Sequence, residues 1–144
     1  MGKASRTKGH GFEREAARDM QLVYPTAKRG IGQSRGGGAE LPDVDGTPFH
    51  IECKRGVKVN VRAALRQAQR DSQGRPVLVL VKEDRIGTVA DRIPTFAVMP
   101  WDELLVLLVR AECGLPAPAA RAAVAQMRAT RARTPDDAGG VVVE

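Results

Sequence analysis

An uninterrupted run of five apolar residues, Val77-Leu78-Val79-Leu80-Val81, follows Pro76. Successive side chains of a strand point to opposite faces, so a run without polar residues is typical of a strand buried on both faces. Such strands occur mainly in sheets that carry helices on their faces. The run therefore predicts the central strand of an α/β domain.

Prolines and glycines divide the rest of the chain into further predicted elements. Phe12, Ala16, Met20 and Val23 recur on one face of a helical pattern that Pro25 ends. The full set is a helix over 9–24, a strand over 27–31, extended segments over 42–46 and 48–54, a helix over 61–71, a strand over 95–99, and helices over 101–113 and 118–131. A glycine-rich basic loop over 32–40 and a loose tail over 134–140 complete the expected order.

The length of 144 residues fits one domain, in which aliphatic side chains must build the core because only 3% of the residues are aromatic. We expect a flexible basic leader over 1–8 and a compact domain over 9–112. The remainder, 113–144, is rich in Ala and Arg and predicts a helix followed by a tail.

The formal charge is +6, and it is concentrated at the front of the chain. Residues 1–37 hold eight Lys and Arg against three acids, a net of +5. Clustered cations gain affinity by releasing counterions from nucleic acid, so this distribution favours a polyanionic partner. A leading apolar stretch and a run long enough to cross a bilayer are both missing from the sequence, and we expect no membrane association.

The two cysteines, Cys53 and Cys113, stand outside any CxxC pair. This pattern predicts neither a disulfide framework nor a structural zinc site, and it fits a reducing cytoplasm. We expect Cys53 to be a small core residue, because the sequence places no partner base beside its thiol.

The residues most suggestive of chemistry are Pro42-Asp43 and Glu52-Cys53-Lys54. Residues two apart on a strand share a face, so Glu52 and Lys54 point the same way. A turn at Gly46-Thr47 would fold the two extended segments into a hairpin and bring Asp43 alongside them. Two carboxylates and one ammonium group are thus expected to converge.

Two carboxylates suit Mg²⁺, which prefers six oxygen ligands and keeps several waters. The expected ligands are Asp43, Glu52 and the main-chain carbonyl of Cys53. A phosphodiester oxygen would complete the coordination, and Lys54 would orient or stabilise the attacking hydroxide. The arrangement predicts hydrolysis without a covalent intermediate.

Several neighbours have two interpretations. Asp45 shares a face with Asp43 and is an alternative ligand, although an exposed turn acid is the simpler interpretation. His50 also lies on the polar face, where it is either a titrating group near the site or incidental. Gln67 and Gln69 follow on the next predicted helix. Either one of them contacts the metal-bound water or DNA, or both are surface residues.

Pro42-Asp43 with Glu52-Cys53-Lys54 matches the signature of the PD-(D/E)XK nuclease superfamily. Gly9-His10-Gly11-Phe12-Glu13-Arg14-Glu15 resembles the first helix of archaeal-type Holliday junction resolvases. The basic glycine-rich stretch over 28–38 resembles the loop of phage-encoded resolvase-like nucleases, and so does Arg66-Gln67-Ala68 after the ExK strand. The likeness covers about residues 9–108, and it departs from the family in the short interval between Asp43 and Glu52.

This resemblance implies a restriction-endonuclease-like core, in which a mixed central β-sheet is flanked by helices. It also implies a Mg²⁺-dependent, structure-selective endonuclease that resolves four-way (Holliday) junctions in DNA by paired hydrolysis. It also implies a homodimer, substitution of Mg²⁺ by Mn²⁺, and a phage-encoded protein in the host cytoplasm. Glu13 would be an additional acid that reaches the metal through water. The DNA contacts we expect are Arg14, Lys28, Arg29, Ser34, Arg35 and Gln67. A flap, end or single-strand nuclease and a non-catalytic DNA-binding module are the alternatives.

Overall fold

The structure is a computed structural model that describes residues 3–31, 41–84 and 95–131. The chain forms two compact units, Met1–Met99 and Pro100–Glu144. The sequence suggested a boundary after residue 112 instead. The division falls earlier because the helix that ends at Cys113 packs against the helix that follows it, and both belong to the second unit.

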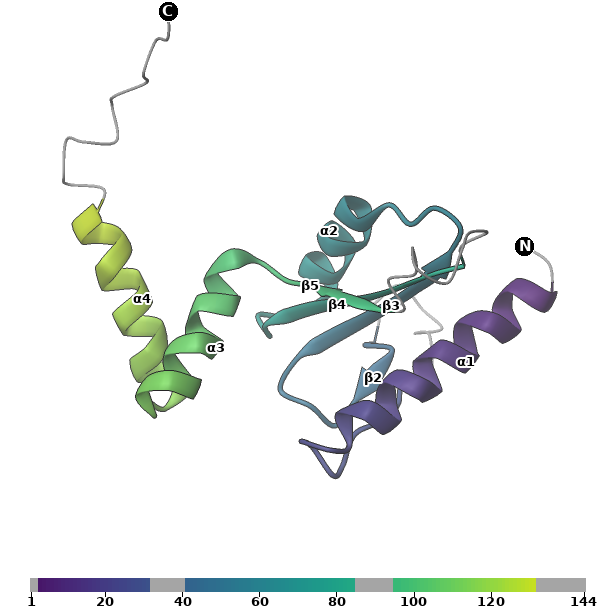
Figure 1. Cartoon of the computed structure of the whole chain (residues 1–144), viewed down its shortest axis with the longest axis horizontal. Coiled ribbons are helices and arrows are strands. Elements are labelled where there is room, and N and C mark those ends of the chain that lie inside the picture. Colours follow the sequence, from purple (N-terminus) through teal and green to yellow (C-terminus); the bar gives the residue numbers. More distant parts are fainter. Residues whose placement is uncertain (1–2, 32–40, 85–94, 132–144) are drawn as a thin grey trace, which may run out of the picture. The chain divides into compact units, whose positions relative to one another are not determined.

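The first unit contains a five-stranded mixed sheet whose strands follow one another in chain order (Figure 1). The parallel pair is β3 and β4, and the other described pairings are antiparallel. A helix, α2, connects the parallel pair, as parallel neighbours require a crossover. The strands are β1 (Lys28–Arg29), β2 (Val44–Asp45), β3 (His50–Gly56), β4 (Val77–Glu83) and β5 (Phe96–Val98), and α2 is Val61–Asp71. The predicted α/β class and the mixed sheet flanked by helices are confirmed.

Strand β4 is the one predicted from the apolar run, and it is an interior strand between β3 and β5. The middle of the five-stranded sheet is β3, so the predicted central position is wrong by one strand. Val77, Val79 and Val81 are buried, whereas Leu78 and Leu80 on the other face are only partly buried. The expected burial is therefore complete on one face of β4 and partial on the other.

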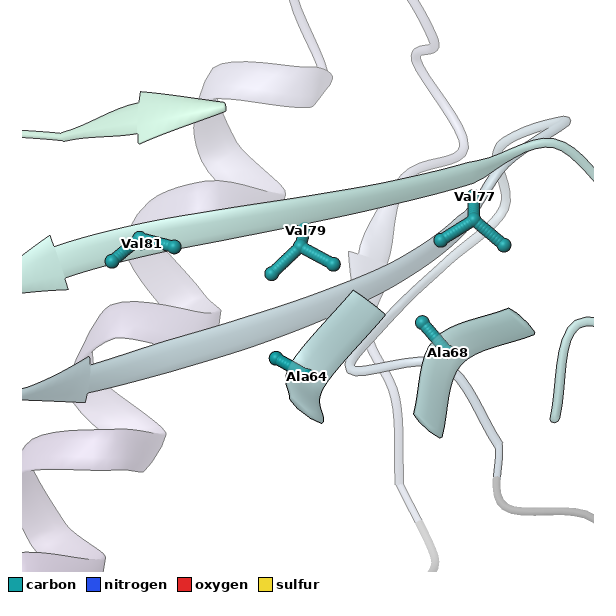
Figure 2. Packing of buried hydrophobic residues seen from close by; sticks show 5 residues of the cluster. All are labelled: Ala64, Ala68, Val77, Val79 and Val81. Carbon is teal, nitrogen blue, oxygen red and sulfur yellow. The ribbon is translucent and has the colours of Figure 1, made fainter. Parts of the chain in front are cut away.

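The buried face of β4 packs against α2 (Figure 2). Ala64 and Ala68 lie opposite the three valines and are buried with them. Alanine side chains are short, so the helix can approach the sheet closely, and each fully buried valine contributes roughly 1.5 to 3 kcal/mol. The start of α2 is fixed by Asn60, whose side-chain oxygen accepts a hydrogen bond from Ala63 N at 3.0 Å.

Helix α1 (Lys3–Met20) covers the opposite side of the sheet, where it contacts β1, β2 and β3 (Figure 1). Phe12 and Ala16 are buried, as the helical pattern predicts. The helix starts well before residue 9, so residues 3–8 form its first turns instead of the flexible leader that we expected. Ala, Arg and Lys have high helix propensity, which extends the helix beyond its apolar face.

The end of α1 also differs from the prediction. The helix stops at Met20, and the chain turns so that Tyr24 N donates to Met20 O at 2.8 Å. Val23, which was expected on the apolar face, is therefore exposed. The pattern of apolar residues continued past the helix because the turn itself contains Leu22 and Val23.

The predicted hairpin of β2 and β3 is present. Val44 lies opposite Ile51, and Asp43 N donates to Ile51 O at 2.8 Å. Gly46 in the connection has φ of 79°, and a Cβ there would collide with the carbonyl oxygen of Thr26. The Thr26 hydroxyl in turn donates to Gly46 O at 3.0 Å. Only glycine satisfies both the positive φ and this close approach.

The second unit is a helical hairpin of α3 (Trp101–Cys113) and α4 (Ala117–Arg131). Gly114, in the left-handed conformation, ends α3 and donates its N–H to Arg110 O. Val106, Ala120 and Val124 form the buried contact between the two helices. Within the described ranges, no helix combines the length and the apolar character needed to cross a bilayer.

Candidate active site

Asp43 is held by the main chain of β3 at two points. Its N–H donates to Ile51 O at 2.8 Å, and its Oδ2 accepts a hydrogen bond from Cys53 N at 2.7 Å. The side chain is therefore pinned against the strand that carries the other predicted site residues. The preceding residue, Pro42, is buried and cannot donate a main-chain hydrogen bond.

Glu52 and Lys54 share the α2 side of β3. They lie opposite Val79 and Val81 of β4, whose side chains face α2. Lys54 Nζ lies 2.5 Å from Glu52 Oε1 and donates to Gln67 Oε1 at 3.2 Å. Gln67 of α2 and Glu52 of β3 thus hold the ammonium group between a helix and a strand.

Electrostatic coupling links Asp43 to this pair. Burial, and then the negative charge of Glu52, raise the pKa of Asp43 to about 7 from 3.8. Glu13 adds to the rise, whereas the hydrogen bond from Cys53 N and the charge of Lys54 oppose it. Such a shift is characteristic of carboxylates crowded together in a partly desolvated place.

The thiol of Cys53 is not activated. Burial raises its pKa well above the ordinary value, and the charges of Asp43, Glu13 and Glu52 add to this effect. A protonated thiol is neither a nucleophile nor a good metal ligand. The main-chain N–H of Cys53, by contrast, binds the carboxylate of Asp43.

Glu13 reaches the same region from α1, where Arg29 Nε lies 2.6 Å from Glu13 Oε2. Arg29 was predicted as a DNA contact, and this ion pair gives it a structural partner within the protein. The end of β1 is fixed to the site as well, because Gly30 N donates to Asp43 O at 2.8 Å. A Cβ at Gly30 would collide with the carbonyl oxygen of Pro42.

The donor set is compatible with Mg²⁺. Asp43 and Glu52 offer hard oxygen ligands, and a divalent cation would offset both the burial of the Asp43 charge and its repulsion by Glu52, which together raise the pKa of Asp43. Glu13, already paired with Arg29, is suited to an outer position. Among the residues that the structure describes, no group of three or more His, Cys, Asp or Glu side chains is arranged to hold a metal ion. Main-chain oxygen and water would therefore have to supply the remaining ligands.

The other predicted residues are dispersed. Arg14 and Lys28 are exposed and available for a partner. Asp45 is also exposed, on the opposite face of its strand from Val44. Ser34 and Arg35 lie outside the described residues.

His50 is fully buried, with Nδ1 3.4 Å from Arg75 Nη2, and is therefore not on an open polar surface. Strand β3 starts at His50, and His50 shares a face with Glu52 and Lys54, as the alternation predicted. The expectation that this face is open to solvent at His50 was wrong. The residue lies under the loop that carries Arg75, and a sequence pattern gives no sign of that cover.

Sequence reasoning missed the role of Gly30 and left that of Gln67 open. Gln67 is half-buried and faces Lys54, so its first role is to hold the lysine. The helical spacing that buries Ala64 and Ala68 already turns Gln67 partly toward the sheet, and this was the available signal. No comparable signal marks Gly30, because its close approach to Pro42 depends on the tertiary fold.

Comparison of the chain with family models, with curated proteins and with solved structures found no match.

Proposed function

We propose that this protein is a Mg²⁺-dependent, structure-selective DNA endonuclease that resolves four-way junctions by paired phosphodiester hydrolysis. The observation that supports the proposal most strongly is the convergence of Asp43 with Glu52 and Lys54 across the β2–β3 hairpin. Burial raises the pKa of Asp43, and the nearby charge of Glu52 adds to the rise. The resemblance to PD-(D/E)XK nucleases and a restriction-endonuclease-like core form part of the proposal.

In this proposal the carboxylates of Asp43 and Glu52 and the main-chain carbonyl of Cys53 hold Mg²⁺, and Glu13 contributes through water. Mn²⁺ substitutes because it accepts the same oxygen ligands. When bound there, the ion would offset charge on the scissile phosphate and lower the pKa of the attacking water. The acids keep the ion in place, and the fold of the hairpin keeps the acids together.

Lys54 supplies the positive charge of the site. Its ammonium group orients the attacking water and stabilises negative charge on a phosphate oxygen. The water oxygen forms a bond to phosphorus as the water loses a proton to solvent, and the bond from phosphorus to the departing sugar oxygen breaks as that oxygen takes a proton from solvent. Gln67 keeps the ammonium group in position while Glu52 binds the metal.

Paired cutting of a junction requires two active sites related by a two-fold axis, so the proposed enzyme is a homodimer. The proposed setting is a cytoplasm, which suits the two free cysteines. Sedimentation of the purified protein with and without junction DNA measures the oligomeric state. A protein that stays monomeric on the junction would contradict paired cutting.

Cleavage assays test the chemistry directly. End-labelled four-way junction, flap, duplex and single-stranded DNA are incubated with the protein in Mg²⁺ or in EDTA. We expect paired nicks in the junction, in Mg²⁺ only. Equal cutting of every substrate would reject junction selectivity in favour of a less selective nuclease, and tight binding without cleavage would favour a non-catalytic DNA-binding module.

Variants in which one acid is replaced by its uncharged amide identify the acids that cleavage requires. Asp43→Asn and Glu52→Gln should lose cleavage by at least about a hundredfold and still bind DNA, because each removes a metal ligand and no phosphate contact. Asp45→Asn is the matched control, since Asp45 is an exposed acid on the same hairpin. Loss of cleavage in Asp45→Asn alone would reassign the ligand from Asp43 to Asp45.

A further inference from the structure

Three arginines on α2 form a row on the surface of the first unit. Arg62, Arg66 and Arg70 are spaced four residues apart, and all three are exposed. Helix residues at this spacing lie on the same side, one above the other. The three side chains, here named the α2 arginine row, lie on the side of the helix away from Ala64 and Ala68, which pack against the sheet.

The α2 arginine row is not neutralised by the protein. Within the described ranges none of its members forms an ion pair, whereas several other cations of this unit do. Arg29, Arg55 and Lys82 pair with Glu13, Asp84 and Glu15. Like charges four residues apart destabilise a helix, and the one acid of α2 is Asp71, at its last position. Helix stability therefore does not account for the row.

We propose that the α2 arginine row binds backbone phosphates of a DNA strand of the substrate. The proposal rests on the proposed function, which it extends with a substrate-binding surface. A guanidinium group matches the geometry of a phosphate and stays charged at any physiological pH. Unneutralised cations of this kind gain affinity by releasing counterions from DNA.

The dimensions of the row suit one strand. At about 1.5 Å of rise per residue, Arg62 and Arg70 are about 12 Å apart along the helix. That length corresponds to about three to four nucleotides of a strand, at ~3.4 Å each along the axis. Contacts with phosphates alone fix the position of the DNA without reading its sequence, which suits an enzyme that selects shape.

The row is also coupled rigidly to the active site. Gln67 belongs to the same helix, directly after Arg66, and accepts the hydrogen bond from Lys54 at 3.2 Å. A strand bound along the outer side of α2 is therefore held at a fixed offset from the ammonium group of Lys54. The α2 arginine row would position the substrate, and the site formed by Asp43, Glu52 and Lys54 would cleave it.

The test measures binding without cleavage. Affinity for a fluorescent four-way junction is measured by anisotropy in EDTA over a series of sodium chloride concentrations. The triple variant Arg62→Gln, Arg66→Gln, Arg70→Gln should bind at least about tenfold more weakly at low salt. Its slope of log affinity against log salt should be smaller by about 2 to 3, as expected for three lost phosphate contacts. Gln has nearly the helix propensity of Arg, so α2 should stay folded, which circular dichroism checks.

A matched control separates the row from net charge. Arg110→Gln, Arg121→Gln, Arg128→Gln removes the same charge from the helices of the second unit and should leave the slope nearly as in the unaltered protein. The proposal is overturned if the control loses as much as the α2 variant, if the α2 variant binds like the unaltered protein, or if the unaltered protein fails to bind DNA. Salt-dependent binding that needs the row, without any cleavage in Mg²⁺, would support the row and reject the nuclease.

Discussion

The ammonium nitrogen of Lys54 lies 2.5 Å from a carboxylate oxygen of Glu52, two positions earlier on the same strand. The side chain of Glu52 is 7% exposed, whereas that of Lys54 is 33% exposed. In the metal-free protein Lys54 is therefore the counter-ion of a buried carboxylate. A divalent cation bound by Glu52 would take over that role, and Gln67 would retain the ammonium group.

The counter-ion role predicts a stability defect. Lys54→Met should lower the free energy of unfolding by about 1 to 3 kcal/mol in EDTA, because the Glu52 carboxylate is left buried without its cation. Adding Glu52→Gln should recover most of the loss, since the buried charge is removed as well. Urea unfolding of the single and double variants measures both effects. A single variant as stable as the unaltered protein would show that the pair does not stabilise the fold.

The hydrogen bond between Gln67 and Lys54 predicts a kinetic defect. Gln67→Leu should lower kcat for junction cleavage about ten- to a hundredfold and leave KM nearly unchanged, because the lysine is misplaced but no phosphate contact is lost. Steady-state kinetics of Gln67→Leu measures both constants. Gln69→Leu is the control, since Gln69 is an exposed residue of the same type on the same helix. A rise in KM with an unchanged kcat would indicate instead that Gln67 contacts DNA.

The pKa of Asp43 predicts how stability changes with pH. In the folded, metal-free protein the pKa of this carboxyl is raised to about 7 by burial and by Glu52, from 3.8. Because the folded state holds the proton more tightly, the contribution of Asp43 to stability is complete below about pH 4 and is lost as the pH rises through about 7. The loss amounts to at most about 4 kcal/mol, at 1.36 kcal/mol for each pKa unit.

Unfolding at a series of pH values in EDTA tests this dependence. Asp43→Asn keeps an oxygen to accept the hydrogen bond from Cys53 N but cannot titrate, so its stability should fall less than that of the unaltered protein between about pH 4 and pH 8. Asp45→Asn should follow the unaltered protein. Mg²⁺ should restore stability at the high end of the range, because it binds the deprotonated carboxylate. Parallel curves for Asp43→Asn and the unaltered protein would contradict the assignment.

The close approach of Gly30 to Pro42 predicts a steric defect. Gly30→Ala should cost about 1 to 3 kcal/mol of stability and reduce cleavage, because the new methyl group overlaps the Pro42 carbonyl and displaces the main chain of Asp43. Gly11→Ala is the contrast, since a Cβ at Gly11 of α1 meets no atom within 4 Å. That change should stabilise the protein by about 0.5 to 1 kcal/mol through helix propensity. Thermal unfolding separates the two outcomes.

The sheet and the hairpin were predictable because both follow from short-range periodicity. The run over 77–81 indicates a strand, and the alternation over 50–54 places Glu52 and Lys54 on the same face. Pro42-Asp43 and the glycine turn at Gly46 then determine which residues meet across the hairpin. Each of these inferences needs only the two-residue repeat of a strand and one turn.

Contacts between distant segments were not predictable in the same way. The hydrogen bond from Lys54 to Gln67 and the approach of Gly30 to Pro42 depend on how elements pack, and packing leaves no fixed spacing in the sequence. The predicted start of α1 was wrong for a related reason. Helix propensity extends α1 to Lys3, beyond the residues that carry the apolar repeat. The boundary after Met99 likewise follows from the pairing of α3 with α4.

Asp43 takes its orientation from the N–H of Cys53 and from the backbone oxygen of Ile51, and neither group depends on which side chain those positions carry. The middle position of the Glu-Cys-Lys triplet is therefore open to replacement by Ala or Val. Proline alone among the standard residues would remove the donor and free the carboxylate. Cys53→Ala and Cys53→Val would keep both hydrogen bonds of Asp43, because both are made by main-chain groups of β3.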